Sequence, residues 1–302
     1  MGDLCKGRVV VITGAGRGLG RSHALAFARE GAKVVVNDLG VSLAGEGNDA
    51  SPANDVVREI QAMGGEAIAN FDDVTDFEAA HRIIDAAIKT FGGLDIVVNN
   101  AGIVRDRMFV NCTPDEWDAV MRVHLRGHFC VSNQAVRYWR DQSKQGVPVD
   151  ARIINTSSGA GLQGSVGQSN YSAAKGGIAS LTLVQAAELR RYGITSNALA
   201  PSARTGMTAG VFGDRMKPPE DGSFDHFHPG NVAPLVVWLG SELSGHVTGR
   251  VFEVEGGKIA IGDGWRSTAG VDKGDRWAPA EVGAAMEQLL ATELPAQKVY
   301  GA

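Results

Sequence analysis

Short runs of β-branched and other apolar residues alternate with longer amphipathic stretches over the first half of the chain. The runs are apolar at every position, as in strands buried on both faces, and lie at residues 9–12, 34–36, 67–69, 96–98 and 153–154. Apolar residues recur at helical spacing over residues 21–30, 55–63 and 77–91. Buried strands that alternate with helices indicate a parallel sheet with helices on both faces, and right-handed crossovers make it doubly wound. The pattern therefore predicts a three-layer α/β fold.

Three loop-like segments interrupt this pattern, and none is long enough to form a second domain. They are residues 40–52, residues 202–229 and the tail 258–302. The second segment contains Pro218-Pro219 and little periodicity, which predicts a mobile flap near a site. The tail regains a helical pattern at about 279–294. We therefore expect a single domain over residues 1–302, with its core at 7–257.

Composition excludes several classes of partner. The 302 residues are 44% hydrophobic and 21% charged, as in an ordinary globular domain. A net charge of -5 offers no basic surface for nucleic acid, and no apolar run reaches the about 18 residues that a membrane span needs. Cys5, Cys112 and Cys130 are widely spaced, which is typical of reduced thiols. Because the first residues do not resemble a secretory signal, we expect a cytoplasmic protein.

A glycine-rich turn follows the first predicted strand and opens the first predicted helix. Its sequence over residues 13–20 is Thr-Gly-Ala-Gly-Arg-Gly-Leu-Gly. Glycines let the backbone approach a pyrophosphate closely, and the N-terminus of the helix offers free N–H groups to that anion. At this place in an alternating chain the turn predicts a dinucleotide site, with a purely structural turn as the alternative. The residues expected at the cofactor are Gly14, Arg17, Gly18, Leu19 and Gly20.

A carboxylate stands at the end of the second predicted strand, in Val36-Asn37-Asp38. Asp38 lies about 20 residues beyond the turn, where an acid accepts hydrogen bonds from both ribose hydroxyls of adenosine and repels a 2′-phosphate. Arg17 indicates the opposite preference, because a guanidinium group there is able to bind a 2′-phosphate. We give the carboxylate more weight and expect NAD rather than NADP, with a loop-capping acid as the alternative role of Asp38.

Tyr171 and Lys175 are spaced one helical turn apart and share one face of a predicted helix. An ammonium group close to a phenol, helped by the positive nicotinamide ring, favours the phenolate and lowers the pKa of the tyrosine from its ordinary value of about 10. The phenolate then serves as general base toward a substrate hydroxyl, and the phenol serves as general acid in the reverse direction. Ser158, just past the strand expected at 152–156, is expected to hold the substrate oxygen.

Five motifs in this order resemble the short-chain dehydrogenase/reductase family over residues 7 to about 257. They are the turn at 13–20, Asn99-Asn100-Ala101-Gly102, Ser158, Tyr171 with Lys175, and Pro201. The resemblance implies an NAD(P)-dependent oxidoreductase with a Rossmann-type sheet of about seven strands. It also implies that the nicotinamide lies near Tyr171, and that further residues contact the cofactor. These are Asp73, Val74, Asn100, Ala101, Gly102, Tyr171, Lys175, Pro201 and Thr205.

The chain departs from the family pattern at two positions. The fourth helix of family members usually carries an asparagine that holds a water of the proton relay, and His124 stands at that position. A packed helix histidine and a member of the relay both remain open as interpretations of His124. Ser202 follows the proline where a glycine is common, which alters the start of the flap.

Several stretches are similar to the dehydrogenase part of the peroxisomal D-bifunctional enzymes of β-oxidation, a subfamily that shares His124. They are residues 36–40 with the loop after them, 99–106, 123–127 and 171–175. This resemblance implies NAD-dependent oxidation of a (3R)-3-hydroxyacyl-CoA with a fatty or steroid-derived acyl group. Apolar flap residues are then expected to cover the acyl group, and flap cations to bind the CoA phosphates. The former are Met207, Val211, Phe212 and Met216, and the latter are Arg204, Arg215 and Lys217.

Other interpretations remain open. Apolar flap residues also dock on a protein's own body, and loop cations are commonly solvated. A 3-oxoacyl carrier-protein reductase or a hydroxysteroid dehydrogenase would use the same chemistry, whereas a dinucleotide sensor without turnover belongs to another class. His226 and His228 resemble half of a metal site, but no third ligand is evident, so no metal is expected. We expect a homodimer or homotetramer, paired as in the family through the helices at about 114–143 and 170–192.

Overall fold

A computed structural model describes residues 2–41, 47, 49–207, 213–262, 264, 270–292 and 299–300 of the chain. An eight-stranded sheet forms its centre, in the order β3-β2-β1-β4-β5-β6-β7-β8. Strands β1 to β7 are parallel, and β8 runs antiparallel to β7. The strands are β1 Val9–Thr13, β2 Lys33–Asn37, β3 Glu66–Asn70, β4 Ile96–Asn99, β5 Ala151–Thr156, β6 Ile194–Ser202, β7 Val251–Glu255 and β8 Lys258–Gly262.

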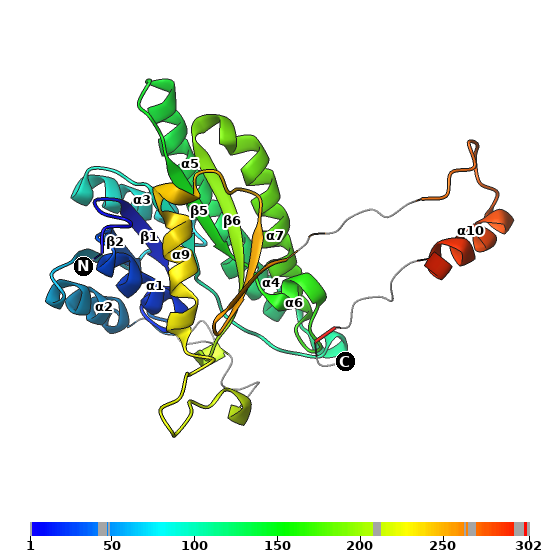
Figure 1. Cartoon of the computed structure of the whole chain (residues 1–302), viewed down its shortest axis with the longest axis horizontal. Helices are drawn as coiled ribbons and strands as arrows, with labels where there is room; N and C mark the ends of the chain where they lie inside the picture. The colour runs from blue at the N-terminus through cyan, green and yellow to red at the C-terminus, as the bar shows by residue number, and fades with distance from the viewer. Residues whose placement is uncertain are drawn as a thin grey trace.

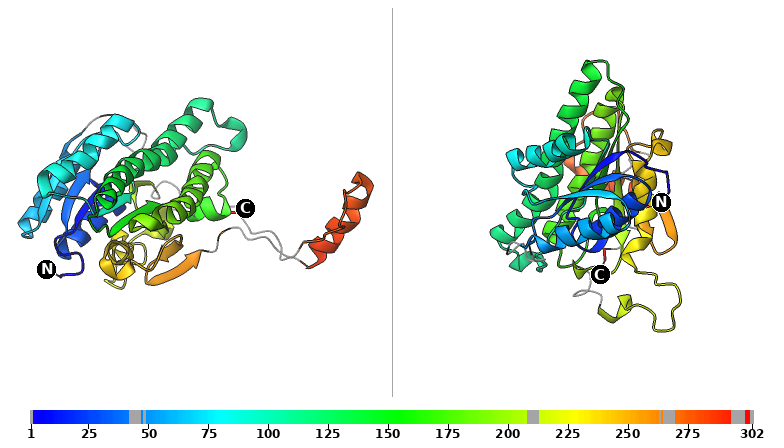
Figure 2. Two further views of the ribbon diagram at one scale, coloured as in Figure 1. Left: turned by 90° about the horizontal axis from the view of Figure 1, so that it is seen from above. Right: turned by 90° about the vertical axis from the view of Figure 1, so that its left-hand side faces the viewer.

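Helices cover both faces of the sheet (Figures 1 and 2). The α-helices of the described residues are α1 Gly18–Arg29, α2 Ser51–Ala62, α3 Phe77–Phe91, α4 Pro114–Met121, α5 Gly127–Lys144, α6 Gly159–Gln163, α7 Ser169–Leu189, α9 Ala233–Gly240 and α10 Pro279–Thr292, of which α10 lies away from the sheet. Successive residues of a strand point to opposite faces, so β1 contributes to both layers. Val10 and Ile12 pack with α1, α2 and α9, whereas Val9 and Val11 pack with α3 and α5. The predicted three-layer doubly wound fold is therefore confirmed.

The sheet has one strand more than the about seven that the family resemblance implied. Strand β8 lies in the segment that the sequence assigned to the C-terminal extension, and it pairs along the whole of β7. The turn between the two strands uses Gly256, whose φ of +55° favours glycine. Ile259 and Ile261 of β8 are more than half exposed, so this edge strand lacks the kind of apolar run by which β1 to β5 were identified.

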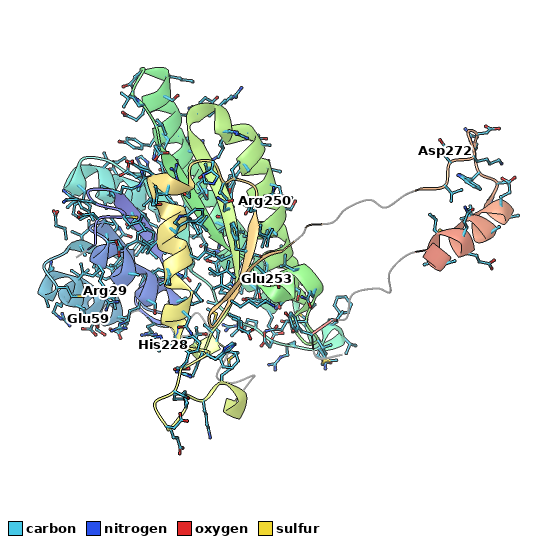
Figure 3. All side chains as sticks on the ribbon, viewed as in Figure 1. Arg29, Glu59, His228, Arg250, Glu253 and Asp272 are labelled. Carbon is cyan, nitrogen blue, oxygen red and sulfur yellow. The ribbon has the colours of Figure 1, made fainter. Side chains whose placement is uncertain are left out.

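The limits of helices α2 and α10 can be compared with those predicted from the sequence. Helix α2 begins at Ser51, inside the stretch 40–52 that the sequence predicted as a loop, and Pro52 sits in its first turn, where a missing N–H costs nothing. Helix α10 coincides with the helix predicted at about 279–294 and stands away from the sheet (Figure 1). The side chains around Asp272, just before α10, stand away with it (Figure 3). No helix in the described part of the chain is long and apolar enough to cross a membrane.

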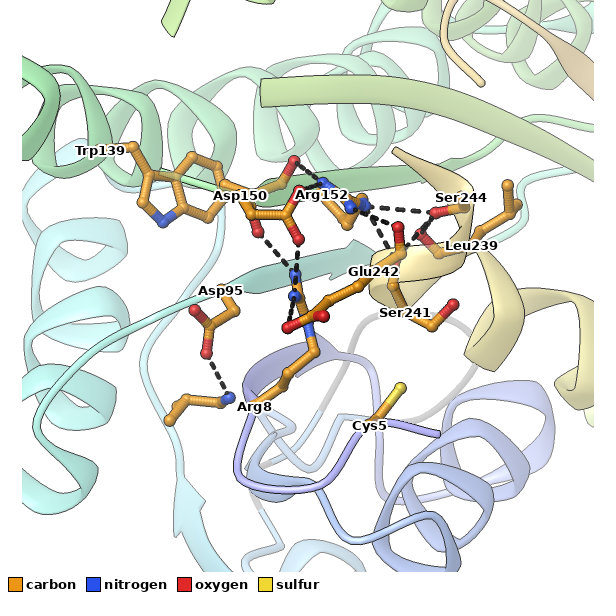
Figure 4. A network of polar contacts seen from close by, with 12 residues as sticks. Cys5, Arg8, Asp95, Trp139, Asp150, Arg152, Leu239, Ser241, Glu242 and Ser244 are labelled. Carbon is orange, nitrogen blue, oxygen red and sulfur yellow. Dashed lines mark hydrogen bonds and ion pairs between the residues drawn. The ribbon is translucent and has the colours of Figure 1, made fainter. Parts of the chain in front are cut away.

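Arg8 and Arg152 form a network of polar contacts at the amino ends of the central strands (Figure 4). Arg152 is almost fully buried and donates from Nε to the carbonyl oxygen of Ser241 at 3.1 Å. Its Nη1 lies 2.6 Å from a carboxylate oxygen of Asp150, and Arg8 donates to the other oxygen of that carboxylate at 2.9 Å. One acid therefore bridges two guanidinium groups. This end of the sheet is stabilised by ion pairs, and ligands of open α/β sheets bind at the other end.

Candidate active site

A cavity of about 800 Å³ lies at the carboxyl ends of the parallel strands, where open α/β sheets bind their ligands. Most of the predicted site residues line it. They are Gly14, Arg17, Gly18, Leu19, Asp38, Asp73, Val74, Asn100, Ala101, Gly102, Tyr171, Lys175, Pro201 and Thr205. Ser158 directly follows the lining residue Ser157, and Gly20 directly follows Leu19. One cavity therefore joins the glycine turn to the predicted catalytic residues.

The glycine turn after β1 has a backbone that brings an anion close. Gly14 and Gly18 have φ values of +61° and +52°, which favour glycine. No described side chain caps the N-terminus of α1, and its first turn contains no acidic residue, so its N–H groups are available to a phosphate. A Cβ on Gly20 would lie 2.1 Å from the carbonyl oxygen of Gly14. Gly20 therefore allows α1 to pack against the turn, a different role from the cofactor contact expected of it.

Asp38 is held in a fixed orientation beside the turn. Its Oδ2 accepts a hydrogen bond from the N–H of Gly16 at 2.8 Å, and its Oδ1 accepts one from the N–H of Gly40 at 2.8 Å. Each oxygen keeps a further acceptor position. The contacts that Arg17 makes with described residues are exposed, such as that from Nη1 to the carbonyl oxygen of Val41 at 3.4 Å. The carboxylate is therefore fixed, and the guanidinium group beside it is loosely held.

Thr13 joins the turn after β4 to the turn after β1. Its Oγ1 accepts hydrogen bonds from the N–H groups of Asn100 at 3.0 Å and Ala101 at 3.1 Å. The side-chain amide of Asn100 donates to the carbonyl oxygens of Thr13 and Gly14, each at 3.0 Å. The amide of Asn100 is thus used within the protein, and the two turns form one hydrogen-bonded unit at the floor of the cavity.

Asp73 and Val74, two of the residues expected at the cofactor, belong to a turn that lines the cavity. The carboxylate of Asp73 accepts hydrogen bonds from the N–H of Thr75 at 2.8 Å and from its hydroxyl at 2.9 Å. Arg122 and Arg126 donate to the hydroxyl and carbonyl oxygens of Thr75, at 3.1 and 2.9 Å. Asp73 therefore fixes the turn, and the side chain of Val74 provides an apolar surface of the cavity.

The three predicted catalytic residues come together between β5 and α7. Lys175 donates from Nζ to the carbonyl oxygen of Thr156 at 2.5 Å, and this Nζ lies 5.5 Å from the centre of the Tyr171 ring. Ser158 caps the N-terminus of α6, where its Oγ accepts a hydrogen bond from the N–H of Ala160 at 3.2 Å. Ser158 also lies close enough to the phenol of Tyr171 to favour its ionised form, which lowers its pKa. A hydroxyl, a phenol and an amine thus converge at one end of the cavity.

In the protein without cofactor, burial is the main influence on the pKa values of Tyr171 and Lys175. It raises the pKa of Tyr171 to about 12, although the nearby side chain of Ser158 opposes the change. It lowers the pKa of Lys175 to about 7. The sequence led us to expect a lowered pKa for Tyr171, but its desolvation outweighs the neighbouring groups, because burial disfavours the charged form of each residue. Ionisation of Tyr171 near neutral pH therefore requires further positive charge in the cavity.

His124 occupies the centre of a π-helical segment, Arg122–Arg126, that joins α4 to α5. Such segments are frequent at functional sites. Its Nε2 lies 2.7 Å from the carbonyl oxygen of Ile103, and its Nδ1 has no hydrogen-bond partner among the described residues. Burial lowers its pKa well below the ordinary value, so the ring is neutral. The ring meets that of Tyr171 edge-on at 5.2 Å, and a Cβ on Gly102 would lie 2.4 Å from its Cε1. His124 thus packs between the Gly102 turn and Tyr171.

Arg204 secures the base of the predicted flap. Its two Nη atoms pair with the carboxylate oxygens of Asp225 at 3.1 and 2.5 Å, and Nη1 also donates to the carbonyl oxygen of Met216 at 2.6 Å. The expected contact of Arg204 with CoA phosphate is therefore not supported, because Asp225 already binds this guanidinium group. Met207 lines the cavity, as expected, and Met216 is buried. Outside the described residues lie Val211, Phe212 and the side chain of Arg215.

The two histidines of the predicted flap, His226 and His228, each contact a polar group of the protein. His226 Nε2 lies 2.9 Å from Oε1 of Glu255, and His228 Nδ1 accepts a hydrogen bond from the N–H of Gly230 at 3.0 Å. In the described part of the chain, no group of three or more histidines, cysteines and acids is placed to hold a metal ion.

Sequence reasoning missed a buried polar network beneath the site. Asn99 of β4 donates to the side chain of Asn155 of β5 at 2.9 Å, and Asn155 donates to Gln185 of α7 at 2.9 Å. Ser196 of β6 donates to the same oxygen of Gln185 at 2.8 Å. These contacts fix α7, which carries Tyr171, over three strands. The available signal was the polar residue that ends each apolar run.

The fold and the site define a class of enzyme, and comparison with known proteins identifies it. The family described as short chain dehydrogenase matches residues 8–215. The chain belongs to this family, and it is an oxidoreductase of the kind that acts on a CH–OH group with NAD or NADP.

Three individual proteins are similar to this chain over most of its length. The crystal structure of a short chain dehydrogenase from Mycobacterium avium is 57% identical, with a TM-score of 0.89, and covers 99% of this chain and 100% of that chain. The hydroxyacyl-CoA dehydrogenase ChsB1 of Mycobacterium tuberculosis is 45% identical over 302 residues, which cover 96% of this chain and 91% of that protein. The peroxisomal multifunctional enzyme type 2 of Mus musculus is 46% identical over 86% of this chain but only 32% of that enzyme. This chain thus corresponds to about a third of the multifunctional enzyme.

Proposed function

We propose that this protein oxidises a 3-hydroxyacyl-CoA to the 3-oxoacyl-CoA with NAD as the hydride acceptor. The observation that carries the proposal is the single cavity that joins the glycine turn of β1 to Tyr171 and Lys175. A nearly full-length relative, 45% identical, is named a hydroxyacyl-CoA dehydrogenase, which supports this choice of substrate.

The residues of the cavity fit a dinucleotide. The uncapped N-terminus of α1 suits a pyrophosphate, and the side-chain-free Gly14 allows its close approach. The open acceptor positions of Asp38 suit two ribose hydroxyls, and its charge disfavours a 2′-phosphate, which supports NAD over NADP. When bound, the nicotinamide supplies a hydride acceptor and a positive charge near Tyr171.

The catalytic roles follow from the positions of three side chains. Ser158 and Tyr171 would hold the 3-hydroxyl group of the substrate, and Tyr171 would accept its proton as general base. Such a group typically contributes about 10² to 10⁴ in rate. Lys175, anchored on the carbonyl oxygen of Thr156, would place positive charge beside the phenol and favour its ionisation. In the reverse direction the high pKa of Tyr171 keeps it protonated, ready to act as the acid.

The test is the absorbance of NADH formed from a panel of (3R)-3-hydroxyacyl-CoA thioesters, with NAD or NADP. The proposal predicts NADH from CoA esters and little product from free alcohols. Turnover restricted to free steroid alcohols would assign a hydroxysteroid dehydrogenase instead, and turnover only with NADP would overturn the role of Asp38.

One alternative, a carrier-protein reductase, has specific support. The 3-oxoacyl-[acyl-carrier-protein] reductase FabG of Thermotoga maritima is 34% identical over 84% of this chain and 98% of that protein, and Arg17 lies where it could bind a 2′-phosphate. NADPH oxidation with a 3-oxoacyl carrier protein, but not with CoA esters, would favour that reductase. Binding of NAD without turnover of any substrate would favour a sensor.

We also propose that the enzyme acts in the cytoplasm as a homodimer or homotetramer. Cys5, Cys112 and Cys130 form no disulfide, as a reducing compartment requires. Phe129 of α5 and Leu183 of α7 are about half exposed, and these helices are the ones expected to pair. Light scattering would show two or four chains per particle, and a stable monomer would contradict the proposal.

A further inference from the structure

The last described residues of the chain return to the loop after α6, the short helix that begins just beyond Ser158 (Figure 1). The N–H of Tyr300 donates to the carbonyl oxygen of Gly164 at 3.2 Å, and the N–H of Val166 donates to the carbonyl oxygen of Tyr300 at 2.9 Å. These bonds form an isolated parallel bridge between Ser165 and Tyr300. The end of the chain is therefore hydrogen-bonded to a loop of the site.

The ring of Tyr300 packs directly on Gly159, the residue after Ser158. A Cβ on Gly159 would lie 2.9 Å from both Cε2 and Oη of this ring. The side chain of Gln163 lies close enough to influence the pKa of Tyr300, and a Cβ on Gly164 would lie 3.4 Å from the side chain of Val299. The absence of a side chain at Gly159 thus makes room for the ring of Tyr300, whereas Gly164 would tolerate a Cβ beside Val299.

Exposed apolar side chains surround this contact. The N–H of Arg107 donates to the carbonyl oxygen of Gly167 at 2.8 Å, which places the loop after β4 beside the loop after Ser158. We define the apolar rim as six side chains that are between 38% and 86% exposed: Met108, Phe109, Val110, Val166, Val299 and Tyr300. Exposed apolar side chains on neighbouring segments of this kind are candidates for binding a ligand or partner.

On the basis of the proposed function, we propose that the apolar rim binds the acyl group of the substrate and that Tyr300 determines specificity for large acyl groups. The loop that carries Met108 also carries Ile103 and Arg105, which line the cavity. The rim also lies next to the catalytic group, since Tyr300 contacts the residue after Ser158. A short acyl group ends inside the cavity, whereas a long or ring-bearing one must pass over the rim.

The chemistry of the rim suits a hydrocarbon. None of its six members is charged, and the nearby Arg107 is paired with Glu116 at 3.0 Å. The rim is built from two loops and the end of the chain, of which Tyr300 packs on Gly159, the residue after the catalytic serine. Hydrophobic burial on these side chains favours acyl groups in proportion to their apolar area.

The test compares kinetics of the full chain with a short and a long substrate, 3-hydroxybutyryl-CoA and 3-hydroxyhexadecanoyl-CoA. Tyr300→Ala is expected to raise KM for the long substrate by about 10- to 100-fold, with kcat and the short substrate changed by less than about twofold. Tyr300→Phe retains the ring and should restore most of the long-chain KM. Leu290→Ser, on the exposed face of α10, is the matched control and should change neither substrate.

The outcomes separate this inference from the proposed function. If the wild type oxidises no CoA thioester, the proposed function fails. If the wild type is active but Tyr300→Ala impairs both substrates equally, Tyr300 only stabilises the loop and the specificity role is overturned. If Tyr300→Ala instead lowers the particle mass in light scattering without changing the ratio of the two KM values, the rim contacts a second copy of the chain and the proposal is also overturned.

Discussion

The buried ammonium of Lys175 is expected to cost folding free energy near neutral pH. Burial lowers the pKa of Lys175 from 10.5 to about 7, so between these values the unfolded chain binds a proton that the folded chain lacks. The stability of the folded state therefore rises with pH across this window, and the full cost is present below it. From these pKa values the cost is about 4 kcal/mol at pH 7 and about 2 kcal/mol at pH 9.

Lys175→Met removes the cost of burying the ammonium group but introduces the cost of an unpaired carbonyl group. The carbonyl oxygen of Thr156 loses the hydrogen bond that Nζ donates at 2.5 Å, and an unpaired buried carbonyl costs about 1–3 kcal/mol. The variant should therefore be more stable than the wild type by about 1–3 kcal/mol at pH 7, with the gain near zero at about pH 9. Its dehydrogenase activity should be lost at the same time, as in a trade-off between stability and function.

Urea unfolding at the two pH values, followed by fluorescence of the five tryptophans and without cofactor, measures the effect. Lys89→Met, at an exposed lysine of α3, is the matched control and should change stability by less than about 0.5 kcal/mol at both. A Lys175→Met variant that is destabilised equally at both pH values would refute the reasoning, because the amine would then carry no desolvation cost.

Three further predictions concern other parts of the structure. Asp38→Ala should lower the ratio of kcat/KM with NAD to kcat/KM with NADP by about 10- to 100-fold, measured by steady-state kinetics; an unchanged ratio would remove Asp38 from cofactor selection. Gly102→Ala places a Cβ 2.4 Å from His124 and should cost about 1–3 kcal/mol of stability in urea unfolding, with a reduced kcat; wild-type values would show that the ring moves freely. Arg152→Met leaves Asp150 with one guanidinium partner and should cost about 2–4 kcal/mol with kinetic constants intact, so altered kinetics would contradict its purely structural role.

The sequence predicted those parts of the fold that depend on fully buried runs. Strands such as β1 and β4 carry runs of β-branched apolar residues that are buried on both faces, so their positions were evident from the pattern alone. Strand β8 has one exposed face and lies at the edge, and its alternating Ile259 and Ile261 were not distinguishable from a tail. The sequence predicted the start of α2 at residue 55 instead of Ser51, because the residues before it are typical of loops.

The candidate site was predictable where local motifs carry the chemistry. The glycine turn, Asp38 and the spacing of Tyr171 and Lys175 depend on neighbours in sequence, and the structure brings them to one cavity. The raised pKa of Tyr171 depends on burial by distant segments, which a local motif does not record. The pairing of Arg204 with Asp225 is also a tertiary contact, and it could not be foreseen from loop composition.

The central claim is that Tyr171 is the proton acceptor in oxidation of a 3-hydroxyacyl-CoA by NAD. The direct measurement is NADH formation by the wild type and Tyr171→Phe, with NADH binding followed by fluorescence in both proteins. Phenylalanine keeps the ring beside His124 and removes only the hydroxyl. The account predicts that kcat falls by about 10² to 10⁴ while NADH still binds. Full turnover by Tyr171→Phe, with binding intact, would contradict the account.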